Sequence, residues 1–160
     1  MLNPFYLCMV FSMLSSTPTF LLSEDAKIVA CNQAQAIISA SDEANIDPFV
    51  LSSLIYHESR FIPTSKSPAG ACGLTQIISK YVPYTCKQLQ DNEELAIFTG
   101  ANILRNWLDK NNNSYYKSLQ CYASGYKCKH APYAKKIINR AKKLKKIYNK
   151  TQRKMQDALY

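Results

Sequence analysis

The feature that most constrains this fold is an apolar segment that carries one carboxyl group and runs into a loop of helix-breaking residues. Asp47 and Pro48 are typical of a helix start, and residues 49–61 are apolar at helical spacing. Residues 62–73, rich in Pro, Gly and Ser, predict a loop. Glu58 shares one helix face with the apolar residues Leu51, Leu54 and Ile55.

The position of Glu58 predicts unusual acid chemistry. A carboxyl group on a face that packs into a core is costly to ionise, so its pKa is expected to rise. Such a group stays protonated near neutral pH and can donate its proton to a leaving group. The alternative is an ordinary surface Glu at a fraying helix end.

The remaining sequence predicts a single all-α domain. The chain has 160 residues, only 4 Gly and 7 Pro, and little strand-like alternation. Asp91 and Glu94 have the spacing of a capping box for one helix. Besides the helix that carries Glu58, the predicted helices are 27–46, 74–80, 92–110, 115–123 and 132–157.

The N-terminus predicts export. Residues 5–14 form an apolar run of signal-peptide length, and Glu24 opens a polar region. We therefore interpret residues 1–23 as a signal peptide, cut somewhere between about 16 and 24. The alternative is an uncleaved anchor, because residues 5–22 approach the length of a membrane span.

The cysteines fit an oxidising compartment. Cys8 lies in the predicted signal, which leaves five others. Nearness in sequence favours the pairs Cys72–Cys86 and Cys121–Cys128, with Cys31 left over, although connectivity stays open. A zinc site would need the closer Cys-x-x-Cys spacing, which is missing.

Charge divides the chain. Residues 1–109 hold 6 basic and 10 acidic residues, whereas residues 110–160 hold 14 basic and 1 acidic residue. Residues 135–160 are thus predicted to be a long basic C-terminal helix, packed on the domain through one apolar face. A basic segment of this kind suits an anionic envelope polymer. The alternative is a solvated face that only maintains solubility.

Two sequence blocks carry a family resemblance. The first contains Glu58 with the residues Ser-Arg-Phe after it, then Ser67-Pro-Ala-Gly-Ala-Cys-Gly-Leu-Thr-Gln76. The second is Cys121-Tyr-Ala-Ser-Gly125, which is similar to an Ala-Tyr-Asn-Ala-Gly block. Together, over roughly residues 30–140, they resemble the transglycosylase domain of soluble lytic transglycosylases, which are goose-lysozyme-like enzymes that cut peptidoglycan. The resemblance implies a lysozyme-like fold, with the transglycosylase-like domain at residues 24–134.

The resemblance also implies roles for single residues. Glu58 would be the catalytic acid and base, Ser67 would face the cleft, and Gln76 would bind the substrate. Tyr122 would orient the Glu58 carboxyl through its hydroxyl. In the second block, which contains Ser124, the Asn of the family is missing, and this puts sugar positioning in doubt because Ser reaches less far than Asn. The alternatives are that Ser67 is only a turn residue, that Gln76 is an ordinary surface residue and that Tyr122 is only part of the core.

The function expected from this resemblance is cleavage of the MurNAc-β-1,4-GlcNAc bond with 1,6-anhydroMurNAc formation, without cofactor or metal. A missing second carboxylate favours this over hydrolysis. His57-Glu58 begins like a zinc-protease helix, but Phe61 stands where its second His belongs.

The expected location is the periplasm or cell envelope. The expected setting is local wall opening, by a secretion apparatus or a phage particle. Alternatives are a hydrolytic lysozyme, a non-catalytic wall-binding module and a basic nucleic-acid binder, although no nucleic acid is expected.

Overall fold

The computed structural model describes residues 2–15 and 17–158, so Met1, Ser16 and residues 159–160 of the predicted signal and C-terminal segments lie outside the described part. Its α-helices are α1 Pro4–Leu14, α2 Glu24–Asn32, α3 Ala34–Glu43, α4 Pro48–Ser59, α5 Cys86–Asp91, α6 Glu93–Lys110, α7 Tyr115–Ser124 and α8 Ala131–Asp157. Its other elements are the short strands β1 Ala71–Cys72 and β2 Ile77–Ile78 and the 3-10 turns η1 Ser79–Tyr81 and η2 Gly125–Lys127. The predicted all-α class is confirmed.

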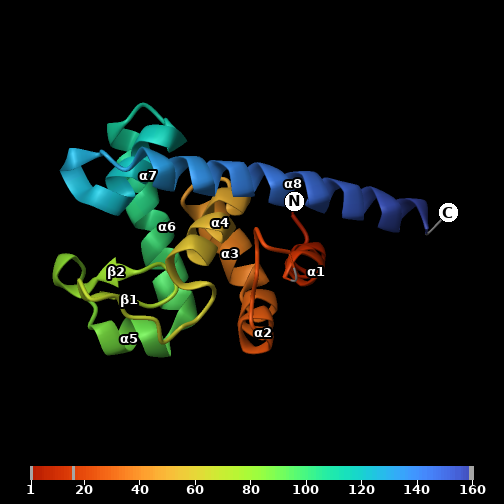
Figure 1. Cartoon of the computed structure of the whole chain (residues 1–160), viewed down its shortest axis with the longest axis horizontal. Helices are drawn as coiled ribbons and strands as arrows, with labels where there is room; N and C mark the ends of the chain where they lie inside the picture. Colours follow the sequence, from red (N-terminus) through yellow and green to blue (C-terminus); the bar gives the residue numbers. More distant parts are fainter. Residues whose placement is uncertain (1, 16, 159–160) are drawn as a thin grey trace.

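Helix α4 is the centre of the arrangement. It lies beneath α8, which runs along the whole length of the molecule, while α6 crosses behind the β1–β2 hairpin and α5 (Figure 1). The Asp47 carboxylate accepts a hydrogen bond from the Phe49 backbone N–H at 2.8 Å, and Pro48 occupies the first turn, as the sequence predicts. Leu51, Leu54 and Ile55 are fully buried, and nine of the 12 residues of α4 are buried in all, so the helix is packed on several sides.

Helix α8 has the predicted two faces. Its buried residues include Ile137, Ala141, Leu144 and Tyr148, which confirms the apolar stripe, while most of its lysines are exposed. No described helix combines the length and the apolar character that a membrane span requires.

Several predicted boundaries were wrong. The predicted helix 27–46 is two helices, because Gln33 leaves helical geometry between α2 and α3. Residues 74–80 form β2 and part of a 3-10 turn instead of an α-helix. The cap of α6 is Asn92, not Asp91, and the short α5, with its Thr85–Gln88 capping box, was not predicted.

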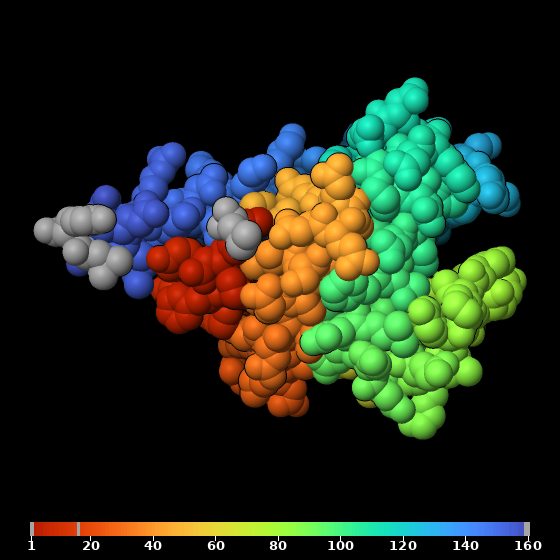
Figure 2. Space-filling model, turned by 180° about the vertical axis from the view of Figure 1, so that it is seen from behind, coloured from red at the N-terminus to blue at the C-terminus, as the bar shows by residue number. Residues whose placement is uncertain are grey.

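The N-terminal segment packs into the domain. Leu7, Val10 and Phe11 of α1 are fully buried. Seen from behind, the red α1 lies beside the orange α2 and the blue α8 (Figure 2). Cys8 bonds to Cys31, so the prediction that Cys31 is left over was wrong. The signal peptide stays a prediction. Its removal would take α1 out of this core and leave Cys31 without its disulfide partner Cys8.

The other two disulfides are the favoured ones. Cys72–Cys86 ties β1 to the first residue of α5, and Cys121–Cys128 ties α7 to the turn before α8. Both bonds hold segments that belong to the two blocks of family resemblance, and each closes a short loop of the chain.

Candidate active site

Glu58 lies in the last turn of α4, where the helix is forced to stop. Arg60 and Phe61 both adopt positive φ, at 52° and 59°, which ends the helix and turns the chain away. The Ser59 hydroxyl donates to the carbonyl oxygens of Ile55, at 3.1 Å, and Leu74, at 2.8 Å. The end of α4 is therefore fixed both to its own preceding turn and to the following loop.

Burial dominates the chemistry of Glu58. Removal of its carboxyl from water raises the pKa from 4.5 to about 7, and a hydrogen bond from Tyr133 partly opposes this rise. The Tyr133 hydroxyl donates to Glu58 Oε1. A carboxyl group with this pKa is largely protonated below neutral pH, so it can serve as a general acid there.

Tyr133 is the site residue that sequence reasoning missed. It lies in the first turn of α8, it is 6% exposed, and burial and the charge of Glu58 raise its own pKa. The His57 ring meets the Tyr133 ring edge-on, with centroids 4.7 Å apart. Burial, then the positive charges of Arg140 and Lys136, lower the pKa of His57 to about 4, so His57 is neutral at pH 7. No local sequence pattern links Tyr133 to Glu58.

Tyr122 lies near Glu58, but its hydroxyl does not bond to the Glu58 carboxyl as the resemblance implies. Its hydroxyl donates to the Thr75 carbonyl oxygen at 2.9 Å, while Tyr133 takes the place expected for it at the carboxyl group. Burial and then the charge of Glu58 raise the pKa of Tyr122, which shows that the two groups are close. Tyr122 thus supports the loop that passes beside Glu58.

Thr75 connects that loop to α6. Its hydroxyl donates to the Ala96 carbonyl oxygen at 2.7 Å, and its side chain lies directly against Gly100. A Cβ atom added at Gly100 would lie 2.5 Å from the Thr75 Cβ, so only glycine permits this approach. The polar side chain of Thr75 is therefore both hydrogen-bonded and tightly packed.

Ser67 and Gln76 shape the loop itself. Ser67 Oγ accepts a hydrogen bond from the Ala71 backbone N–H at 3.1 Å. This contact is typical of a Ser that stabilises a turn, which is the alternative given for it above. Gln76 Nε2 donates to the carbonyl oxygens of Ser65, at 3.1 Å, and Gly73, at 3.0 Å. Both side chains are partly exposed, but their polar atoms face the loop backbone.

Ser124 closes α7. Its hydroxyl donates to the Gln120 carbonyl oxygen at 2.8 Å and accepts from the Lys129 backbone N–H at 3.1 Å. It thereby joins the helix end to the segment that Cys121–Cys128 bridges. Among residues 2–15 and 17–158, no group of three His, Cys, Asp or Glu side chains is arranged to hold a metal ion.

The fold and this site define a class of protein: an all-α, lysozyme-like domain with a glutamic acid of raised pKa at the end of a buried helix. The model of the transglycosylase SLT domain matches residues 35–149, and the chain belongs to that family. The family places it among lytic-transglycosylase-type, peptidoglycan-cleaving enzymes. The comparison with curated proteins gave no match.

Proposed function

We propose that this protein is a peptidoglycan lytic transglycosylase that cleaves the MurNAc-β-1,4-GlcNAc bond and uses Glu58 as its single acid and base. The observation that carries the proposal is the pKa of Glu58, which burial raises to about 7, together with the Tyr133 hydrogen bond that fixes one carboxyl oxygen. The family indicates the substrate class, and the burial of the Glu58 carboxyl supports its role as the proton donor.

In the first step, protonated Glu58 gives its proton to the bridging oxygen as the C1–O bond of MurNAc breaks. The GlcNAc fragment leaves with a free 4-hydroxyl, and positive charge develops at C1 of the sugar. Tyr133 stabilises the carboxylate that remains, because its O–H already points at Oε1 and a hydrogen bond to an ionised acceptor is stronger than one to a neutral acceptor.

In the second step, the Glu58 carboxylate removes the proton of the sugar's own 6-hydroxyl, whose oxygen bonds to C1. The product is a 1,6-anhydroMurNAc end, and Glu58 is again protonated without any consumption of water. Within residues 2–15 and 17–158, burial and the Tyr133 hydrogen bond are the causes of the shift in the pKa of Glu58, and no carboxylate is among them. One carboxyl group with a pKa near 7 is suited to both roles.

The deciding experiment is digestion of purified peptidoglycan, with the masses of the products recorded. We expect muropeptides that are lighter by one water than those a hydrolase releases, and no products from the Glu58→Gln variant. Hydrated ends would instead assign a lysozyme that uses water as its nucleophile. Clearing of walls by Glu58→Gln as well as by the parent would indicate a non-catalytic binding module.

We also propose that the protein is exported and works in the periplasm or cell envelope. Its family acts on the cell wall, and its six cysteines form three disulfides, which persist in oxidising compartments. The exposed lysines and arginine of the last turns of α8, beyond its packed stripe, would add affinity for an anionic envelope polymer. These residues are Lys150, Arg153 and Lys154.

A further inference from the structure

Three cations converge where the end of α4 meets α8. Arg60 caps α4, while Lys136 and Arg140 project from α8, and all three lower the pKa of His57 through their positive charge. Arg60 and Lys136 are exposed and Arg140 is half-buried. We call Arg60, Lys136 and Arg140 the basic cluster.

Two of these cations share one aromatic ring. The Cζ of Arg140 lies 4.3 Å from the ring centroid of Tyr56, and the Cζ of Arg60 lies 5.1 Å from it. Arg60 Nη1 donates to the Tyr56 hydroxyl at 2.8 Å, and Arg140 Nε donates to the Thr19 carbonyl oxygen at 3.1 Å. The two guanidinium groups are therefore held in fixed positions near each other.

Among the described residues, no carboxylate forms an ion pair with the basic cluster. The ion pairs among the described residues lie elsewhere: Lys27–Glu24, Lys87–Asp91, Arg105–Asp109 and Lys145–Asp47. Arg140 Nη1 is buried and has no hydrogen-bond partner. Burial and the charge of Arg60 lower the pKa of Arg140, so the arrangement costs free energy as it stands.

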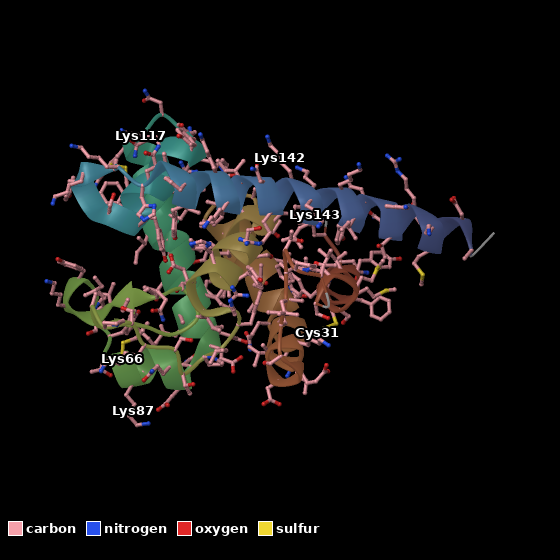
Figure 3. All side chains as sticks on the ribbon, viewed as in Figure 1. Cys31, Lys66, Lys87, Lys117, Lys142 and Lys143 are labelled. Carbon is pink, nitrogen blue, oxygen red and sulfur yellow. A yellow bond between two sulfur atoms is a disulfide. The ribbon has the colours of Figure 1, made fainter. Side chains whose placement is uncertain are left out.

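The basic cluster continues directly from the site of Glu58. Tyr133, Lys136 and Arg140 recur at the spacing of one face of α8, and Tyr133 is the residue that holds Glu58. Lys143, which donates to Thr19 Oγ1 at 2.7 Å, extends the same face towards α1, whereas Lys142 lies on the opposite edge of α8 (Figure 3). A substrate held at Glu58 would therefore bring its neighbouring groups towards these cations.

We infer that the basic cluster is a subsite for an oxyanion carried by the glycan strand. The oxyanion is either a carboxylate of the peptide attached to muramic acid or a phosphate of a polymer linked to the strand. Guanidinium groups bind both through paired, charge-assisted hydrogen bonds, and the exposed Arg60 and Lys136 are the cations of the cluster that a bound strand can reach. The inference rests on the proposed function for the identity of the strand, and it makes the enzyme selective for decorated over bare glycan.

The test measures equilibrium binding of soluble glycan strands in a Glu58→Gln background, so that turnover plays no part. The strands are prepared intact, stripped of peptide by an amidase, or stripped of phosphate polymer by hydrofluoric acid. We expect Arg60→Gln with Lys136→Gln to raise the Kd for intact strands about tenfold, in the range of a lost charge-assisted contact. Lys142→Gln with Lys146→Gln, which also removes two exposed charges from α8 but outside the basic cluster, is the matched control and should change the Kd less than twofold.

The substrate arms identify the oxyanion. If the tenfold effect disappears on peptide-stripped strands, the ligand is a carboxylate, and if it disappears on phosphate-stripped strands, the ligand is a phosphate. The inference would be overturned if the Kd rose equally for all three strand preparations or did not rise at all. It would also be overturned if the control variant raised the Kd as much as the substitutions in the basic cluster. If the parent enzyme turned over none of the strands, the proposed function would be refuted instead. The binding measurements would still be valid, because they do not depend on turnover.

A further variant separates binding from folding. Arg140→Gln removes the hydrogen bond to the Thr19 carbonyl oxygen and the contact with the Tyr56 ring, so the variant should melt below the parent temperature, and its affinity for intact strands should fall as well. A fall in melting temperature together with unchanged affinity would show that Arg140 only supports the fold.

Discussion

Helices α4 and α8 meet at the candidate site, yet they are opposite in character. Nine of the 12 residues of α4 are buried, against seven of the 27 residues of α8. Glu58 on α4 owes its chemistry to burial, whereas Tyr133 on α8 contributes a directed hydrogen bond and the rest of α8 contributes exposed positive charge. The contrast teaches that α4 sets how tightly the proton is held, and α8 sets where the carboxyl points and which charges lie beside it.

The largest effect should come from the end of α4. Glu58→Gln is expected to lower kcat at least about 10³-fold on peptidoglycan, because the variant has no proton to donate or accept. In the parent, the raised pKa means that the folded state holds its proton more tightly than the unfolded state. Its stabilising contribution is present below pH 4.5 and is lost as the pH rises through about 7.

The same variant thus tests burial without substrate. Glu58→Gln should be more stable than the parent by on the order of 2–3 kcal/mol at pH 8 and equal to it at pH 4, in chemical denaturation. Equal stability at both pH values would mean that the Glu58 carboxyl is not desolvated, and the contrast between the two helices would fail.

A smaller effect should come from the start of α8. Tyr133→Phe removes the hydrogen bond that opposes the rise in the pKa of Glu58, so the alkaline limb of the pH–rate profile should move upward from about pH 7. Loss of the carboxyl's orientation should lower kcat by about 10–100-fold. The measurement is a full pH–rate profile of the purified variant.

Tyr122→Phe is the matched comparison. Its hydroxyl donates to the Thr75 carbonyl oxygen, so this variant should lower stability while the alkaline limb stays in place. If the limb moved in Tyr122→Phe and not in Tyr133→Phe, the carboxyl group would be oriented by Tyr122, as the family resemblance implies.

The two faces of α8 give the next prediction. Leu144 is fully buried, so Leu144→Ala should cost about 2–4 kcal/mol of the free energy of unfolding. The exposed Lys146 two positions later should cost less than about 0.5 kcal/mol when it is replaced by Ala. Similar costs at both positions, measured by urea unfolding, would mean that α8 does not pack as described.

The smallest effect should come from the end of α8. Replacement of Lys150, Arg153 and Lys154 by Gln should weaken binding to whole cell walls a few-fold and reduce its salt dependence, with kcat unchanged. Wall co-sedimentation at several salt concentrations measures this. An unaltered salt dependence would remove the anionic polymer from the proposal and leave a merely solvated helix face.

Local patterns in the sequence were enough for much of the fold. The Asp47–Pro48 start, the apolar stripe of α8 and the pair Cys72–Cys86 each depend on residues close in sequence, and each is confirmed. Helix α5 escaped prediction because its six residues are too few to show a period, and Gln33 breaks a helix without any Gly or Pro to mark the break.

The candidate site was harder to predict than the fold. Burial of Glu58 follows from its helix face, and the sequence predicted the raised pKa. Its partner Tyr133 lies 75 residues away, and that contact depends on how α8 crosses α4. The pairing of Cys8 with Cys31 was missed for a related reason, because the N-terminal segment had been assigned to export rather than to the core.

The contact between Thr75 and Gly100 limits how this enzyme could change over generations. A lone exchange of Gly100 for any larger residue would push Thr75 away from α6 and disturb the carbonyl that receives Tyr122. The two positions are therefore expected to mutate together, so a designer who wants an apolar side chain at position 75 should build a paired library at both sites.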